Sequence, residues 1–286
     1  ITELTEGRIT THYFAAGERV GAFDSFDEVA SGNSQAYIAA DYYWKGKHPA
    51  WAYFTSVPFG MTTIEWNAWI KYKGGQELWD ELAGGYGLKS IACGATGTQM
   101  GGWFNKEIES ADDLKGLKMR VPSQEVYVQT SKAFGANPQE LPYVEVYQAL
   151  QTGVVDGQDN APSNIWDFKI HEVSEYLTIT NYATGPDPLM VNLGWYESLP
   201  YDLKIIFDEV SRETMEFSDR INREKEAEYI EKISNKLEVN HVTGDDLIPF
   251  RDAVKPVYQY FAEKGILTLD EIEKAREVAA GKSIKP

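Results

Sequence analysis

Strand-type and helix-type segments alternate along this 286-residue chain, and this alternation limits the fold more than any other feature. Short apolar runs are typical of strands, and longer runs with an apolar residue every three or four positions are typical of helices. The expected strands are 8–14, 36–44, 88–93, 118–121, 177–180 and 189–193. The expected helices are 25–31, 63–82 with an interruption at Gly74, 111–115, 126–134, 143–151, 200–237, 248–263 and 269–280. Such alternation predicts an α/β architecture with mostly parallel sheets.

The chain shows no internal repeat and no low-complexity linker between two halves. Two domains would therefore share strands that cross from one to the other. We expect an N-terminal α/β domain from 1–97 with about 188–215, and a C-terminal α/β domain from 98–187 with about 216–286.

Acidic residues dominate the charge. Aspartate and glutamate exceed lysine and arginine by 44 to 27, which gives a formal net charge of −17 at pH 7. A field of this sign repels nucleic acid and anionic membrane surfaces, so we expect neither as a partner. It would also oppose the approach of an anionic ligand, which buried cationic or amide groups would have to attract locally.

Cysteine and hydropathy exclude further classes. The single cysteine, Cys93, allows no intramolecular disulfide, and its apolar surroundings favour a small core residue over a nucleophile. No apolar stretch approaches the ~20 residues that cross a bilayer, and the first residues lack the pattern of a signal peptide.

Signatures of catalysis are absent from the sequence. It contains no phosphate loop, no Gly-x-Ser-x-Gly elbow and no His-Glu-x-x-His helix. The four histidines are isolated from one another and from Cys93, so we expect surface or satisfied core residues.

Three places invite a binding role. Arg120 ends a predicted strand, where a guanidinium can hold a carboxylate with two hydrogen bonds, although a salt bridge to one of many acids is the alternative. Residues 156–162 combine acids, amides and proline in one turn, which is either a binding loop or a solvated one. Aromatic residues cluster at 42–44 and at Trp51, Trp66 and Trp103, where most are expected in the core and a few could wall a pocket.

Several strings occur together and in a fixed order along most of the chain. They are Phe14-Ala-Ala-Gly-Glu, Asp41-Tyr-Tyr-Trp-Lys-Gly-Lys, Val57-Pro-Phe-Gly-Met, Gln99-Met-Gly-Gly-Trp-Phe-Asn-Lys-Glu-Ile, Asp112-Asp-Leu-Lys-Gly-Leu-Lys-Met-Arg-Val-Pro and Ala149-Leu-Gln-Thr-Gly-Val-Val-Asp-Gly. In these strings the chain resembles the solute-binding proteins of tripartite ATP-independent periplasmic (TRAP) transporters. The Tyr-Tyr-Trp and Met-Gly-Gly-Trp-Phe strings are more similar to the branch that binds 2-oxo and 2-hydroxy monocarboxylates.

The resemblance implies a two-domain clamp with crossing hinge strands, a long helix that spans both domains, and closure around a small organic carboxylate. Arg120 matches the family arginine that pairs with the ligand carboxylate, and Tyr42 or Tyr43 matches an aromatic hydroxyl that reaches the ligand. Gln99 matches a ligand-contacting position that, with Asp159 and Asp187, holds a cation. The resemblance implies sodium or calcium there and no organic cofactor.

Asn160 departs from the oxo-acid branch. The string Asp156-Gly-Gln-Asp-Asn is similar to that of the sialic acid and dicarboxylate branches, whose asparagine binds the carboxylate. A C4-dicarboxylate or a sugar acid is therefore the alternative ligand. A lyase or dehydratase that uses Asp159 and Asp187 as acid and base is the alternative from another class, and a receptor whose ligand only signals is a third.

The resemblance also implies a periplasmic location, TRAP membrane permease subunits as partners, no direct membrane insertion and no enzymatic activity, and it leaves a homodimer open. Family members begin with a strand and a helix before the segment that matches Gly7-Arg-Ile-Thr. We therefore expect this sequence to be shortened at its N-terminus.

Overall fold

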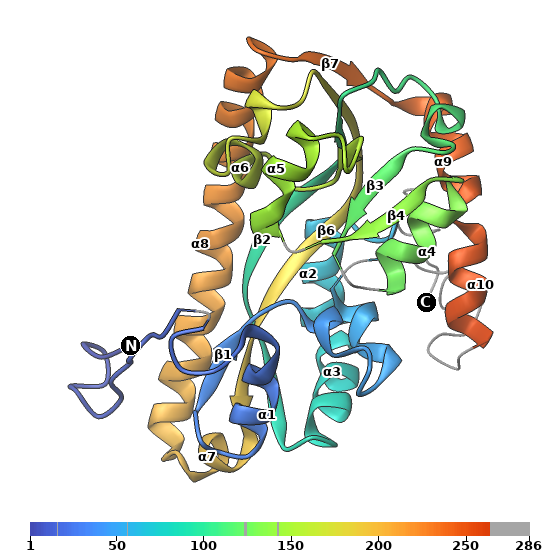
Figure 1. Ribbon diagram of the computed structural model, residues 1–286. Coiled ribbons are helices and arrows are strands. Elements are labelled where there is room, and N and C mark those ends of the chain that lie inside the picture. Colours follow the sequence, from blue (N-terminus) through green and yellow to red (C-terminus); the bar gives the residue numbers. More distant parts are fainter. Residues whose placement is uncertain (16, 56, 123–124, 142, 264–286) are drawn as a thin grey trace. The chain divides into compact units, whose positions relative to one another are not determined.

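The computed structural model describes residues 1–263 except 16, 56, 123–124 and 142 (Figure 1). Within the strands, the side chains of residues 99–101 and 181–185 lie outside this description. Helices and strands intermix along the chain, so the α/β class expected from the sequence is confirmed.

The chain divides into two compact units. Unit 1 consists of Ile1–Thr55, Trp66–Ala95 and Pro186–Ile221, and unit 2 of the remainder. The division expected from the sequence placed residues 56–65 in the first domain, whereas here they belong with unit 2. Four elements contribute residues to both units: α2 (Thr63–Tyr72), β2 (Leu88–Phe104), β6 (Tyr176–Asn192) and the long helix α8 (Tyr201–Ser234).

Unit 1 contains short helices around aromatic side chains. Its own elements are η1 (Ala22–Asp24), α1 (Ser25–Ala30), β1 (Ala36–Ile38), η2 (Asp41–Trp44), η3 (Pro49–Phe54), α3 (Gly75–Gly84) and α7 (Leu193–Ser198), where η marks a 3-10 helix. Phe26 lies 5.3 Å from the ring of Trp44 and 5.6 Å from that of Trp51, and Trp79 stacks on Phe54 at 5.5 Å. Aromatic burial therefore dominates this core.

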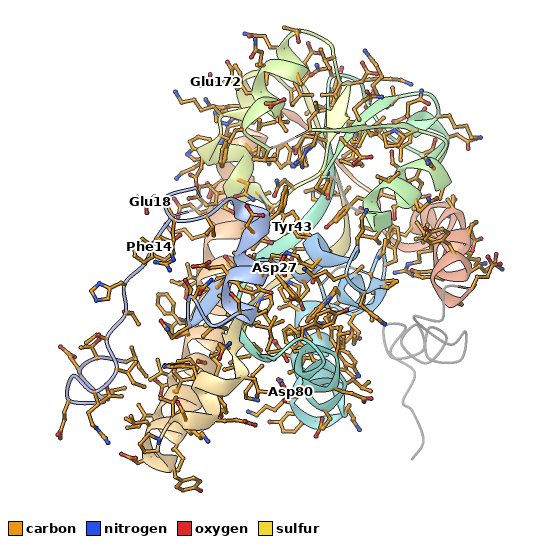
Figure 2. The ribbon with its side chains drawn as sticks, turned by 60° about the horizontal axis from the view of Figure 1, so that its bottom comes forward. Phe14, Glu18, Asp27, Tyr43, Asp80 and Glu172 are labelled. Carbon is orange, nitrogen blue, oxygen red and sulfur yellow. The ribbon has the colours of Figure 1, made fainter. Side chains whose placement is uncertain are left out.

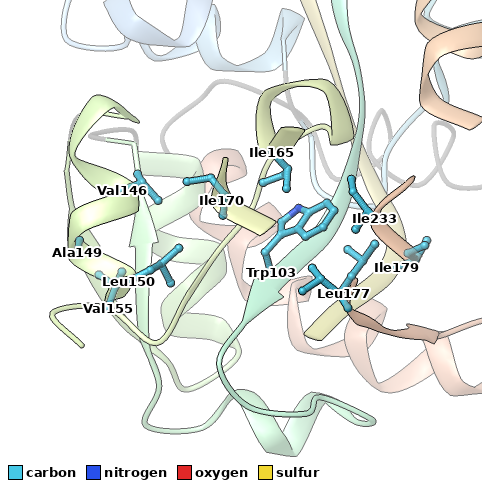
Figure 3. Packing of buried hydrophobic residues seen from close by; sticks show 11 residues of the cluster. Trp103, Val146, Ala149, Leu150, Val155, Ile165, Ile170, Leu177, Ile179 and Ile233 are labelled. Atoms are coloured by element: carbon cyan, nitrogen blue, oxygen red, sulfur yellow. The ribbon is translucent and has the colours of Figure 1, made fainter. Parts of the chain in front are cut away.

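Unit 2 adds more strands. Its own elements are η4 (Ala111–Leu114), β3 (Lys118–Val121), α4 (Glu125–Ala133), β4 (Asn137–Glu140), η5 (Tyr143–Glu145), α5 (Val146–Gln151), β5 (Gly157–Gln158), α6 (Pro162–Asp167), η6 (Ile170–Glu172), β7 (Glu238–His241), η7 (Gly244–Asp246), α9 (Leu247–Ala253) and α10 (Lys255–Glu263). One core cluster surrounds Trp103 with aliphatic residues such as Ile165, Leu177 and Ile233 (Figure 3). A second core cluster includes Phe104 of β2, Met119 of β3 and Phe250 of α9.

The sheet is mixed, whereas mostly parallel pairing was expected. The described strands follow the order β1-β6-β2-β5-β3-β4, with β7 paired to β6. Strand β3 is parallel to β4 and β5, but β2 is antiparallel to β5 and β1 is antiparallel to β6. The parallel set β4-β3-β5 carries Arg120, and its carboxyl ends meet at one edge.

Several local predictions match the observed elements. The strand 118–121 is confirmed, and Ser110 and Asp113 form the expected capping box before η4. The helix expected over 63–82 is two helices, because Gly74 adopts a φ of 85° between α2 and α3. The strand expected at 8–14 is wrong, since these residues have no regular structure, and the helix expected at 269–280 lies outside the described residues. No helix in the described part of the chain combines the length and the apolar character that spanning a bilayer requires.

Candidate functional site

Arg120 is a buried cation at the carboxyl end of a parallel strand. It lies next to the last residue of β3, which Pro122 ends because proline has no N–H for the strand ladder. The residue is 7% exposed, and its Nε and Nη2 donate to the carbonyl oxygen of Leu141 at 3.0 and 2.9 Å. An arginine stays charged wherever it is placed, so a buried one requires acceptors or an anion.

Tyr143 lies beside this cation. Its ring centroid is 5.1 Å from Cζ of Arg120. Burial raises the pKa of the Tyr143 hydroxyl, while the charge of Arg120 lowers it and the charge of Asp159 raises it. A guanidinium and a carboxylate therefore both act on this hydroxyl.

Asn160 presents the donor end of its amide here. Its Oδ1 accepts from the backbone N–H of Ala161 at 2.8 Å and from Nδ2 of Asn164 at 2.7 Å. These two donors determine the orientation of the amide, so that its NH₂ group is the end left for other contacts. The Asn160 side chain also lowers the pKa of the Tyr143 hydroxyl, although that hydroxyl has no hydrogen bond of ordinary geometry among the described residues.

Arg120 and Asp159 also line a cavity that lies within unit 2. About 60 Å³ of it is open to the centres of water-sized molecules. Its walls are mainly apolar and include Phe104, Met119 and Phe134. Most of these apolar residues belong to the core cluster of Phe104, Met119 and Phe250, and neither Tyr143 nor Asn160 borders the cavity.

Asp187 belongs to unit 1, in the part of β6 that follows Gly185. Burial raises the pKa of its carboxyl group to about 6. Asp41 of the same unit is fully buried, and its Oδ2 accepts from Nε1 of Trp79 at 2.6 Å. Burial raises the pKa of Asp41 well above its usual range, the Trp79 hydrogen bond lowers it, and the charge of Asp187 raises it further. The two acids of unit 1 are therefore electrostatically coupled.

The structure describes only part of the group of residues that the resemblance implies for a bound cation. Gln99 lies in β2 with its side chain outside the described residues, and Asp159 and Asp187 lie in different units. Among the side chains that the structure describes, no three of histidine, cysteine, aspartate and glutamate converge as a metal site. The donors still fit sodium or calcium in kind, because both ions prefer carboxylate, amide and carbonyl oxygens.

Tyr42 and Tyr43 lie in η2 of unit 1, and their ring centroids are 4.8 Å apart. Tyr43, which is labelled in Figure 2, is an exposed residue. The structure thus brings Arg120, Asp159 and Asn160 together in unit 2, whereas the part of the two tyrosines in the site stays a prediction.

Tyr143 was not among the site residues predicted from the sequence. A signal for it existed, because Tyr143 follows the end of β4 as Arg120 stands at the end of β3, and the carboxyl ends of parallel strands meet. The pairing of 118–121 with 137–140 had to be known before that signal could be used.

Comparison with known proteins identifies the family. The sequence pattern of the family described as bacterial extracellular solute-binding protein, family 7 (DctP), matches residues 1–264. The chain belongs to this family. The similarity to TRAP solute-binding proteins expected from the sequence strings is thereby confirmed.

Two relatives have names that differ in the ligand. A monocarboxylate 2-oxoacid-binding periplasmic protein of Nostoc sp. is 35% identical over 72% of this chain and 57% of its own length. A C4-dicarboxylate-binding periplasmic protein of Rhodobacter capsulatus is 32% identical over 60% of this chain and 52% of its own length. The chain therefore matches little more than half the length of these two relatives.

Solved DctP-family structures agree with the fold. A TRAP periplasmic solute-binding protein of Pseudoalteromonas atlantica with bound sodium and pyruvate is 32% identical, with a TM-score of 0.85. Another from Colwellia psychrerythraea with bound calcium and pyruvate is 30% identical, with a TM-score of 0.87. Each match covers 98% of this chain and 87% of the other chain. These relatives are receptors that bind small molecules.

Proposed function

We propose that this chain is a periplasmic receptor that binds a small 2-oxo or 2-hydroxy monocarboxylate and delivers it to the membrane permease of a TRAP transporter. The single observation that carries this proposal is the buried Arg120 beside Tyr143 and the donor end of Asn160. A planar guanidinium holds a carboxylate with two parallel hydrogen bonds, and an amide NH₂ and a hydroxyl can add further donors. Local donors of this kind overcome the repulsion of an acidic chain.

We propose a monocarboxylate over a C4-dicarboxylate or a sugar acid, because the relative of Nostoc sp. that is 35% identical over 72% of this chain is a monocarboxylate 2-oxoacid-binding protein. The relatives that hold pyruvate support the same choice. Asn160 is the observation that favours the alternative, since the sequence around it is similar to that of the dicarboxylate and sialic acid branches.

The test is calorimetric titration with pyruvate. Arg120→Ala should weaken binding by a factor of ~30 or more, because removing one partner of a buried ionic pair costs about 2–5 kcal/mol. Arg120→Lys should also bind poorly, since a point charge cannot replace the planar fork. Arg223→Ala, on the long helix α8, is the control for loss of one positive charge. Affinity close to that of the unmodified protein in both Arg120 variants would overturn the assignment.

A cation bound with the ligand belongs to the same proposal, and Gln99, Asp159 and Asp187 are the residues that would hold it. A bound sodium or calcium ion would bridge the carboxylate oxygens of protein and ligand and reverse the local negative field. The test is a pyruvate titration after exhaustive chelation in sodium-free buffer, repeated with each ion restored. Full affinity without any cation, together with unchanged binding by Gln99→Ala, would show that the ligand needs no ion.

We also propose that the chain does not convert its ligand into another compound. Pyruvate, and any acid that co-purifies, should be recovered unchanged after prolonged incubation, as magnetic resonance of the mixture can check. Conversion of the acid that depends on Asp159 would favour the lyase or dehydratase alternative instead.

A further inference from the structure

Gln158 has a buried side-chain amide to which the proposed ligand site of Arg120, Tyr143 and Asn160 assigns no role. It ends the two-residue strand β5 and is fully buried. Neither Oε1 nor Nε2 has a hydrogen-bond partner among the described residues. Burying an amide without hydrogen bonds is unfavourable, so a group of this kind is usually satisfied by an internal water or serves a function.

The register of the sheet places Gln158 between Trp103 and Arg120. Its Cα is paired with Trp103 on β2 and with Arg120 on β3. Residues paired in register point to the same face, and neighbouring strands lie about 4.8 Å apart. The indole of Trp103 is directed elsewhere, because its Nε1 donates to the carbonyl oxygen of Asn160 at 3.4 Å. Arg120 is thus the polar neighbour that shares a face with the Gln158 amide.

The guanidinium of Arg120 needs restraint on more than one side. The carbonyl oxygen of Leu141 holds the edge formed by Nε and Nη2, and the Tyr143 ring lies against the group. A flexible side chain that is held in its binding orientation before the ligand arrives loses less entropy on binding. An amide oxygen on the same face can accept a hydrogen bond from such a donor, either directly or through a bridging water.

We propose that Gln158 is a positioning residue that holds the Arg120 guanidinium in the orientation that receives the ligand carboxylate. This inference rests on the proposed function and deepens it, because it adds a residue that acts on the ligand through Arg120 and does not touch it. Gln158 lies in the polar turn 156–162 that the sequence singled out, but it was not among the predicted site residues.

The experiment is titration of the full chain with pyruvate. Gln158→Leu keeps much of the side-chain volume and removes the hydrogen-bonding groups. It should weaken pyruvate binding about tenfold while the melting temperature stays equal or rises. Ser174→Ala is the matched control, because Ser174 is another buried residue of unit 2 whose hydroxyl has no partner among the described side chains and backbone. It should leave the affinity unchanged, and an equal loss in this control would overturn the inference.

A double-mutant cycle separates positioning from a general structural effect. In the Arg120→Lys background, which lacks the planar group, Gln158→Leu should change the affinity less than about twofold. A tenfold loss in that background, or no loss in the unmodified background, would overturn the inference. Gln158→Glu keeps the acceptor if the leucine variant fails to fold. Its carboxylate should pair with Arg120 and compete with pyruvate, so affinity equal to that of the unmodified protein would also overturn it. If the unmodified chain binds no pyruvate, the proposed function fails, whereas unaffected Gln158 variants of a pyruvate-binding chain remove only this inference.

Discussion

The two units of this protein bury opposite charges, Asp41 in unit 1 and Arg120 in unit 2. An aspartate can take up a proton when it is buried, and the raised pKa of Asp41 shows the tendency. An arginine cannot lose its proton, so unit 2 carries a cation that must be compensated by other groups. The buried acid of unit 1 can therefore become neutral by protonation, whereas the buried cation of unit 2 keeps its charge.

The two units also differ in the residue types of their cores. In unit 1 the tryptophans supply N–H groups, which donate from Trp79 to Asp41, from Trp44 to the carbonyl of Phe23 and from Trp66 to the carbonyl of Phe54. The Trp103 cluster of unit 2 is mainly aliphatic and offers few such donors. Both units nevertheless bury polar atoms without a partner among the described residues, such as Nε1 of Trp51 in unit 1 and the amide of Gln158 in unit 2.

Removal of an aromatic ring from the core of unit 1 should cause the largest loss in the free energy of unfolding. Trp79→Ala should lower the free energy of unfolding by about 3–5 kcal/mol, because it opens a cavity in the unit 1 core. Urea denaturation followed by circular dichroism measures this. Trp79→Phe keeps most of the ring but removes the donor to Asp41, so its smaller loss isolates the hydrogen bond. A loss below about 1 kcal/mol for Trp79→Ala would contradict the view that aromatic packing stabilises unit 1.

Addition of one methyl group tests the tight packing of unit 2. A Cβ on Gly157 would lie 2.2 Å from Cδ1 of Phe104, so Gly157→Ala must displace a buried ring. We expect a loss of about 1–3 kcal/mol in the free energy of unfolding. Gly46→Ala of unit 1 is the control, since nothing lies within 4 Å of its Cβ. Equal stabilities of the two variants would show that the Phe104 ring moves freely.

The pH dependence of stability tests the buried acids of unit 1, first Asp187 and then Asp41. Burial raises the pKa of Asp187 from 3.8 to about 6, so between these pH values the folded state binds more protons than the unfolded state. Stability should therefore fall as the pH rises from about 4 to about 6, by on the order of 1–2 kcal/mol for this group. Thermal melting across this range should show a flatter profile for Asp187→Asn.

Asp41 acts with the same sign, because its folded-state pKa is also raised. Asp41→Asn keeps an oxygen acceptor for Trp79 and removes the titration, so it should become more stable relative to the unmodified protein as the pH increases. Arg120→Ala serves as the unit 2 counterpart, and its profile should retain the slope of the unmodified protein. Parallel profiles for all variants would mean that neither acid of unit 1 titrates in the folded state as proposed.

A surface ion pair should have the smallest effect. Nζ of Lys47 lies 2.6 Å from Oδ1 of Asp27, whose side chain is 68% exposed (Figure 2). Asp27→Asn should change the free energy of unfolding by less than about 0.5 kcal/mol, because water and salt screen such pairs. Melting at low and high salt should give nearly equal shifts. A loss of several kcal/mol would show that exposed pairs of unit 1 matter as much as its buried groups.

Local features of this chain could be predicted from sequence alone. The strand 118–121, the capping box at Ser110 and the helix break at Gly74 each depend on residues within one or two turns of each other. The position of Arg120 at a strand end belongs to this class too, since Pro122 ends the strand locally. Family strings added the expectation of a carboxylate receptor.

Tertiary structure alone decided the rest. Mixed strand pairing, the 17-residue length of β2 and β6 and the contact of Tyr143 with Arg120 all join residues far apart in the chain. Burial of Gln158 and the raised pKa of Asp41 likewise follow from what surrounds each side chain after folding. Hydrophobic periodicity and capping act over a few residues, whereas strand register and desolvation depend on long-range contacts that no local pattern encodes.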